Sequence, residues 1–396
     1  MDFSLGLLKL TAHKFKLVEC DKAIKAITSS RHLKVLLSLT LKVTEVCQVL
    51  ASPRELHEFC KTVLMRVGVS ESDAEIVADA LVMANLRGVD SHGVVRLHSY
   101  VERILRGLID PKAKPQVVRD FGAACLIDGN NGLGYVAAMR AVHAAVEKAR
   151  KYGVGVAGVR NSNHFGMAAY YGIKIAEGKM VGIVLANAAP AMAPWGGKTA
   201  RLGTNPICIV FPLKDGEHIT LDMALSVVAR GKIRLAALKK ERIPESWAFD
   251  EEGRPTTDPE AALRGTLAPI GGYKGYGLAM AVDILSGILT GSAYSIYVKA
   301  LDDYSGPSRV GFFIEAINVE AFRPYDEYLK DVQDFVKLIK ETPKAYGVPE
   351  IYLPGEIEIN IMRKRLREGI PLDHETLSLL KKTAMRLGVE LPQFLK

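Results

Sequence analysis

The sequence predicts a mixed α/β fold (α+β) with helices at both chain ends and a sheet between them. Apolar residues recur at helical spacing after Pro53, and charged helical segments return from about residue 322. Between residues 121 and 321, short apolar runs typical of buried strands alternate with helical ones. We therefore expect a helical domain built from residues 53–120 and 322–396, beside a mixed α/β domain over residues 121–321.

Residues 1–52 differ from the rest of the chain. They hold one glycine, no proline and four of the eight net positive charges, and their apolar run VLLSLTL (35–41) predicts a short helix or strand. No chemistry is visible there. We interpret residues 1–52 as an N-terminal extension that is disordered or not native to the mature protein.

Composition and charge exclude several classes of protein. The net charge of +8 leaves only +4 outside the first 50 residues, with no aromatic-interleaved basic stripe, which argues against nucleic-acid binding. No run approaches the ~20 apolar residues of a membrane helix, and MDFSLGLLKL lacks the basic start of a signal peptide. Five scattered cysteines without a C-x-x-C pair indicate free thiols in a reducing compartment, so we expect a cytoplasmic protein.

The sequence predicts individual helices and strands along the chain. PRELHEFCKTVLMRVG begins at Pro53 and ends at Gly68, and the next helix is capped by Ser70. The predicted strands are ACLIDG, VGVAGVRN, MVGIVLANAA and NPICIVFPL, and the later helices are YGLAMAVDILSGILTG, YDEYLKDVQDFVKLIKETPKAYG and DHETLSLLKKTAMRLG.

A glycine pattern invites a dinucleotide-binding interpretation. Gly132, Gly134 and Ala137 form G-x-G-x-x-A between a predicted strand and a helix. The next strand ends in Arg160 and Asn161 instead of the acidic residue that binds ribose. We interpret these glycines as allowing a helix to pack closely after a turn.

The segment DSHGVVRLHSY (90–100) concentrates groups that move protons or bind anions. As a helix starting near Ser91, it places His92, Arg96, Tyr100 and Arg103 within roughly 80° of one another. Histidine exchanges protons near neutral pH, and an arginine one turn away binds a carboxylate in two-pronged fashion. The helix N-terminus is expected to lower the pKa of His92. A solvated polar helix face explains the same spacing, and spacing alone does not separate the two.

Four other segments carry polar groups in predicted loops or turns. His164 lies in NSNHFG after a strand, and Asn205 ends a long glycine-rich loop. Asp222 follows HITL and is placed either to orient His92 or to cap a helix. GGYKGYGLA opens a helix with glycines around Lys274, a combination suited to phosphate.

A metal-dependent hydrolase is the competing hypothesis from a different enzyme class. Its ligands would be Asp90, His92, His164 and Asp222, although their spacing matches no recognised ligand pattern. We therefore expect no metal site. A non-catalytic dimer that keeps the fold is a third possibility.

Together, eight motifs in order resemble the type-2 malate/L-lactate dehydrogenase family, from about Arg54 to near the C-terminus. They are DSHGVVRLHSY, NSNHFG, APWGGK, LGTNP, LDMALS, IPESWAFDEEGRPTTDP, GGYKGYGLAMAVDILSG and PGE. The resemblance implies a non-Rossmann domain binding NAD or NADP over residues 121–321, a homodimer, and oxidoreduction of a small 2-hydroxy/2-oxo acid of malate or L-lactate type.

The resemblance also implies roles for single residues. His92 matches the proton donor, with Ser91 and Asp222 as its relay partners, and His164 matches a histidine to which some members assign the proton-acceptor role. The substrate contacts that match are Arg96, Tyr100 and Asn205. The cofactor contacts that match are Asp222, Met223, Ala224, Lys274, Pro354, Gly355 and Glu356. Leu225 replaces the threonine of the usual DMATS, which leaves cofactor preference open.

Overall fold

The computed structural model describes residues 49–396, so the prediction for residues 35–41 lies outside the described part. Strand β1 (Val49–Ala51) pairs antiparallel with β11 (Ile370–Leu372) near the other end of the chain. We had assigned residues 49–51 to the extension. They instead form part of the fold, because Ala51 is fully buried where these two strands meet the helices.

A seven-stranded mixed sheet forms the centre of the molecule, in the order β2-β3-β4-β10-β5-β6-β7. Within the described residues only β3 and β4 are parallel neighbours in this sheet. As predicted, this sheet differs from the doubly wound parallel sheet of a Rossmann domain. Its strands are β2 (Gln116–Phe121), β3 (Ala124–Asp128), β4 (Val154–Ser162), β5 (Met180–Ala186), β6 (Ile207–Pro212), β7 (His218–Met223) and β10 (Val310–Asn318).

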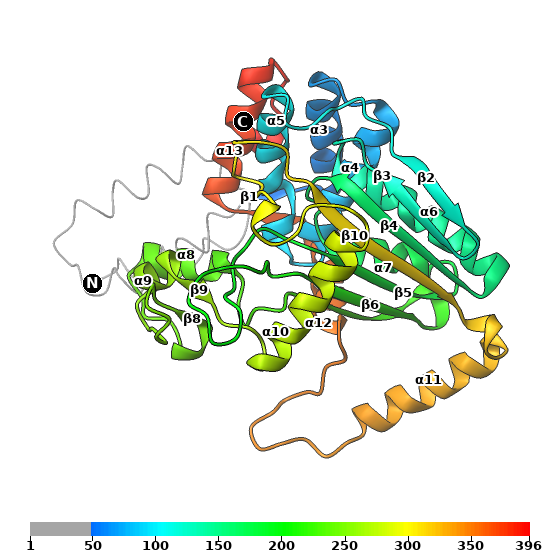
Figure 1. Cartoon of the computed structure of the whole chain (residues 1–396). Helices are drawn as coiled ribbons and strands as arrows, with labels where there is room; N and C mark the ends of the chain where they lie inside the picture. Colours follow the sequence, from blue (N-terminus) through cyan, green and yellow to red (C-terminus); the bar gives the residue numbers. More distant parts are fainter. Residues whose placement is uncertain (1–48) are drawn as a thin grey trace, which may run out of the picture.

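Helices from both chain ends pack together at one side of the sheet (Figure 1). Helix α13 contacts α3 and α5, and α12 contacts α4. Because these helices share a core, each of them carries apolar residues at helical spacing. This spacing is what predicts the helices from the sequence. These helices are α3 (Pro53–Arg66), α4 (Glu71–Leu86), α5 (Leu97–Leu105), α12 (Glu356–Glu368) and α13 (His374–Leu387).

The helix predicted from residue 91 begins only at Leu97. Two short 3₁₀ turns, Asp90–His92 and Val94–Arg96, precede it. Gly93 between them has an extended backbone, with φ −86° and ψ −152°, so one continuous helix cannot pass through this residue. Ser91 is therefore not a helix cap.

Helices α6 (Gly134–Tyr152) and α7 (Ala168–Ala176) pack against the central strands. A Cβ atom at Gly134 would lie 2.1 Å from the carbonyl oxygen of Asn163. Only glycine therefore lets α6 start this close to the loop that carries His164. The interpretation of the glycine pattern as a packing device is confirmed.

A smaller lobe with its own core follows β7 (Figure 1). Helix α11 (Tyr325–Lys340) differs from all of these elements, because it extends away from the rest of the molecule and buries none of its residues. The lobe consists of α8 (Arg230–Lys239), β8 (Ala248–Phe249), α9 (Pro259–Arg264), β9 (Thr266–Leu267), α10 (Tyr273–Asp283) and the π-helical turn Ile284–Ile288.

Two general expectations concern the described residues. Cys60, Cys125 and Cys208 are free, buried thiols, as predicted. None of the helices within residues 49–396 combines the length and apolar character needed to cross a membrane.

Candidate active site

Two histidines far apart in the sequence lie face to face in the structure. The rings of His92 and His164 are 5.6 Å apart, with 24° between their planes. His92 comes from the first 3₁₀ turn, and His164 from the loop after β4. Both are largely enclosed yet keep some solvent exposure, so each remains accessible to a small molecule.

Hydrogen bonds fix the protonation of His164. Its Nδ1 accepts a bond from the backbone N–H of Gly166 at 3.3 Å, and the Tyr100 hydroxyl lies 2.6 Å from the same atom. A backbone amide only donates, so Nδ1 carries no proton, and the neutral ring is protonated at Nε2. The fully buried Tyr100 also bonds the Tyr135 hydroxyl at 2.9 Å.

His92 is held in its neutral form. Its Nδ1 lies 3.0 Å from Ser91 Oγ. Burial, followed by the positive charge of Arg96, lowers the pKa of His92 to about 4. The expected direction is found, but the predicted cause, a helix N-terminus, is wrong because no α-helix starts there. Burial and the neighbouring charges of His92 and Arg96 also hold the pKa of His164 well below its usual range.

Arg96 is available to an anion. Its Nε donates to the carbonyl of Ser91 at 2.7 Å, which anchors the base of the guanidinium. Its two terminal nitrogens make no hydrogen bond to any residue between 49 and 396. The guanidinium is half buried beside two imidazoles, and its two terminal nitrogens form a free fork. This arrangement suits a substrate carboxylate.

The predicted polar row ends at Tyr100. Arg103 is fully buried and points away from the row, donating to the carbonyls of Asp303 at 2.6 Å and Gly306 at 2.9 Å. It fixes the loop before β10. His98 of α5 bonds Thr383 of α13 at 2.9 Å, which links the two helices.

Asp222 lies within β7 and is not hydrogen-bonded to His92. Its Oδ2 accepts a bond at 2.9 Å from the N–H of Ala169, at the start of α7. Burial raises the pKa of Asp222 to about 6, although the side chain is solvent-exposed. The carboxylate is therefore surrounded by protein but still open to water. The predicted direct relay between Asp222 and His92 is therefore not formed.

Asn205 needs a different role from the substrate contact predicted for it. It is fully buried, its Nδ2 donates to the carbonyl of Ala279 at 2.8 Å, and its Oδ1 accepts from Ala188 N–H at 3.0 Å. These bonds anchor its loop to α10. The side chain has no surface left for a substrate.

The predicted phosphate-binding segment has the donors that such a group requires. Helix α10 starts after Gly271 and Gly272, both with positive φ, and its N-terminus has no side-chain cap. Lys274 is exposed and forms no ion pair within the described residues. Free backbone N–H groups beside an ammonium suit the diphosphate of a dinucleotide.

The PGE segment is built more tightly than the sequence indicated. A Cβ at Gly355 would lie 2.8 Å from Thr220 Cβ, so the segment packs directly on β7. The Glu356 carboxylate is already held by Lys340 at 2.6 Å and by the N–H of Leu353 at 2.8 Å. Leu225, by contrast, is fully buried in the core of the small lobe, so the missing threonine hydroxyl falls at a core position.

Sequence reasoning missed two groups near the site. Tyr135 supports Tyr100, but an aromatic residue in a helix gives no sign of this contact. Arg87 is 2% exposed, its Nε and Nη1 have no hydrogen-bond partner among the described residues, and its charge partly offsets the rise in pKa that burial causes at Asp222. A single arginine at the end of a helix normally reaches solvent, so its burial was not predictable.

The metal hypothesis fails on geometry within the described residues. No three His, Cys, Asp or Glu side chains between residues 49 and 396 gather as metal ligands. Asp90, one of the proposed ligands, is paired with Arg365 at 2.6 Å.

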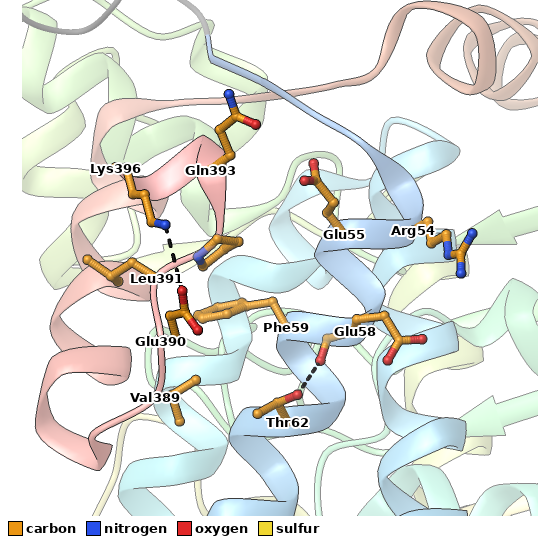
Figure 2. Close-up of a pocket in the computed structure, with 11 residues that line it drawn as sticks. Arg54, Glu55, Glu58, Phe59, Thr62, Val389, Glu390, Leu391, Gln393 and Lys396 are labelled. Atoms are coloured by element: carbon orange, nitrogen blue, oxygen red, sulfur yellow. Dashed lines mark hydrogen bonds and ion pairs between the residues drawn. The ribbon is translucent and has the colours of Figure 1, made fainter.

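A surface groove elsewhere in the molecule is unrelated to these groups. It has a volume of about 570 Å³ and lies between α3 and the C-terminal residues (Figure 2). Phe59 and Leu391 line it, together with charged residues such as Glu58 and Lys396. None of the predicted site residues lines the groove.

Comparison with known proteins tests the resemblance. The sequence profile of the malate/L-lactate dehydrogenase family matches residues 51–381. The chain belongs to this family. As a family member, this dehydrogenase is an oxidoreductase of 2-hydroxy acids and requires a nicotinamide cofactor.

Individual relatives agree in sequence and in structure. The malate dehydrogenase of Pyrococcus abyssi is 42% identical over 85% of this chain and 94% of its own length. The sulfolactate dehydrogenase structure from Methanocaldococcus jannaschii has a TM-score of 0.82 at 41% identity, covering 86% of this chain and 98% of the other. The malate dehydrogenase structure from Pyrococcus horikoshii has a TM-score of 0.80 at 41% identity, covering 87% and 97%. The predicted fold and family are confirmed.

Proposed function

We propose that this dehydrogenase interconverts a small 2-hydroxy acid of malate or L-lactate type and the corresponding 2-oxo acid. The observation that carries the proposal is the free guanidinium fork of Arg96 beside the stacked rings of His92 and His164. Similar enzymes named malate and sulfolactate dehydrogenases support a substrate with a second anionic group.

Each side chain of the site has a separate role in the proposed reaction. A nicotinamide cofactor, when bound, would accept or supply the hydride at C2 of the substrate. Arg96 binds the substrate carboxylate, and the Nε2–H of His164 donates a hydrogen bond to the C2 oxygen. His92 takes the hydroxyl proton during oxidation, because its lowered pKa keeps it neutral at pH 7. In the reverse direction His92 returns this proton, and the substrate's negative charge favours the imidazolium.

We assign cofactor binding to the start of α10, the end of β7 and the PGE segment. We propose that Lys274 and the start of α10 would hold the diphosphate of NAD or NADP. Asp222 and Met223 at the end of β7, with Ala224 directly after it, would contact the same cofactor. Pro354, Gly355 and Glu356 would support this site, since the segment packs on β7 and Glu356 is committed to its own ion pair with Lys340.

A homodimer accounts for the apolar surface of the small lobe. The exposed residues of α10 and the following turns include Ile284, Ile288 and Leu289, which are 44%, 53% and 65% exposed. Helix α11 adds Phe335 and Leu338, which are 58% and 68% exposed on a helix that has no fully buried residue. Isolated amphipathic helices of this length are marginal in water, so a second copy is the covering surface that we propose.

The decisive experiment measures oxidation of NADH and NADPH with oxaloacetate, pyruvate, sulfopyruvate and a cyclic imine. We expect turnover with at least one 2-oxo acid and a clear preference for one cofactor. Absence of turnover with all four, while the protein remains folded, would refute the proposal. Nucleotide titration of the same preparation distinguishes an inactive enzyme from a non-catalytic dimer.

A further inference from the structure

The segment that carries His92 and Arg96 has little regular structure of its own. Its two 3₁₀ turns contain three backbone bonds: His92 N to Val89 O, Gly93 N to Asp90 O and Arg96 N to Gly93 O, at 2.9, 3.1 and 3.0 Å. Such turns have poorer hydrogen-bond geometry than an α-helix. Accurate placement of the two side chains therefore requires contacts from outside the segment.

Asn85, at the end of α4, supplies the first of these contacts. Its Oδ1 accepts a bond from Val94 N–H at 2.8 Å, and its Nδ2 donates to Asp90 Oδ1 at 2.6 Å. One buried amide therefore holds both 3₁₀ turns. Gly93 fits closely beneath it, because a Cβ there would lie 2.1 Å from Asn85 Oδ1.

Arg365, on α12, supplies the second contact. Its Nη1 and Nη2 bind the two carboxylate oxygens of Asp90 at 2.6 and 3.0 Å, and Nη1 also donates to the Asn85 carbonyl. The side chain is only 15% exposed. A two-pronged, charge-assisted pair of this kind fixes orientation as well as distance.

The other end of α12 is attached to the strand that carries Asp222. Thr220 N–H donates to the carbonyl of Pro354 at 3.0 Å, and Gly355 packs on Thr220. The helix therefore runs from β7 to Asp90 as a rigid spacer. It sets the position of the 90–96 segment relative to β7, which carries Asp222.

We propose that Arg365 is a positioning residue, which acts through Asp90 and Asn85 to hold His92 and Arg96 at the substrate. The inference rests on the proposed function, since it concerns the geometry of the same reaction. It assigns a catalytic purpose to a C-terminal helix that touches neither histidine. The Arg365–Asp90 pair also gives a role to the carboxylate that lies next to Ser91 and His92 in the sequence.

The test compares Arg365→Lys with wild type on the best substrate found in the panel. Lysine keeps the charge but loses the two-pronged geometry. We expect kcat/KM for the 2-oxo acid to fall roughly tenfold to a hundredfold, because a 1 Å misplacement of reacting groups costs about that much. Nucleotide affinity, measured by titration, should change less than about twofold.

Arg363→Lys is the matched control on the same helix. Arg363 pairs with Glu217 at 2.7 Å, but both side chains are more than half exposed. We expect its kinetics to match those of wild type. If Arg363→Lys and Arg365→Lys reduce kcat/KM equally, the proposal is overturned.

Asp90→Asn keeps the shape of the side chain and provides a second variant should Arg365→Lys fold poorly. If Arg365 acts through Asp90, the double variant should lose no more activity than the worse single variant. Additive losses, or a loss that disappears after correction for the folded fraction, would contradict the proposal. Inactive wild type would instead contradict the proposed function, so the two failures remain distinguishable.

Discussion

At the scale of single residues, the site depends on where protons are placed on its two imidazoles. Gly166 and Tyr100 both contact Nδ1 of His164, so its Nε2–H remains free for the substrate. Ser91 Oγ lies 3.0 Å from Nδ1 of His92, and a bond donated by Nδ1–H to this oxygen would leave Nε2 as the proposed base. Two similar side chains thus take different roles because their partners differ.

Tyr100→Phe tests this division of roles. The change removes one of the two donors at His164 Nδ1 but leaves the amide of Gly166. We expect kcat to fall about tenfold, since the protonated nitrogen is less firmly fixed. Tyr135→Phe, which affects His164 only through Tyr100, should have a smaller effect. Nitrogen-15 NMR of the histidines is the direct measurement, and an unchanged His164 tautomer with unchanged kcat would contradict the assignment.

The lowered pKa of His92 predicts a pH dependence of stability. A folded-state pKa of about 4, against 6.5 for an ordinary histidine, means that the unfolded chain binds more protons between these values. The contribution is fully present above pH 6.5 and is lost as pH falls toward 4. We expect wild type to lose about 2 kcal/mol from this residue between pH 7.5 and pH 5.

Denaturant unfolding at the two pH values measures this loss. His92→Asn should lose less stability than wild type over the same interval, because asparagine does not titrate. His218, whose pKa burial also lowers to about 4, contributes a similar loss to both proteins and cancels in the comparison. Equal losses in both proteins would show that His92 is not the group responsible.

At the scale of elements, close contacts at glycine decide how the site is assembled. Helix α6 starts against the loop of His164, where no Cβ fits at Gly134. Helix α12 starts against β7 at Gly355 for the same reason. Each glycine lets one element approach a loop or strand that carries a functional group.

Gly134→Ala tests the first of these contacts. The added Cβ would lie 2.1 Å from a backbone oxygen that cannot rotate away, so α6 and the His164 loop must separate. We expect a loss of about 2–3 kcal/mol in the free energy of unfolding and a lower kcat. Gly231→Ala, in α8 with open space around it, is the control and should be neutral or slightly stabilising. Equal stability of both variants would refute the packing argument.

At the scale of the whole molecule, apolar surface remains uncovered on α10 and α11. Ile288, in the π-helical turn after α10, and Leu338 of α11 are 53% and 68% exposed. Burying apolar surface is worth roughly 25 cal/mol per Å², and we propose that a second copy of the chain covers these side chains. The homodimer therefore remains a prediction with a definite location.

Ile288→Arg and Leu338→Glu test that location separately. Each places an unpaired charge in the proposed interface, so we expect the dimer to dissociate at micromolar protein concentration. Light scattering after size-exclusion chromatography gives the mass, and Met65→Glu on α3, 44% exposed and outside both the small lobe and α11, serves as the control. Dimers that persist in both interface variants would place the contact elsewhere.

The sequence alone determined the class of fold, four strands of its central sheet and the family, because apolar periodicity and short motifs are local properties of the chain. It also predicted His92, Arg96, Tyr100 and His164 as site residues, and the structure brings the two histidines and Tyr100 together. Tertiary structure alone decided that Arg103 turns inward, that Asn205 anchors a loop, and that Asp222 contacts Ala169 instead of His92. It also brought Arg365 to Asp90 across 275 residues. The physical reason is that a hydrogen-bond partner is chosen by distance in space, which short-range spacing in a sequence does not encode.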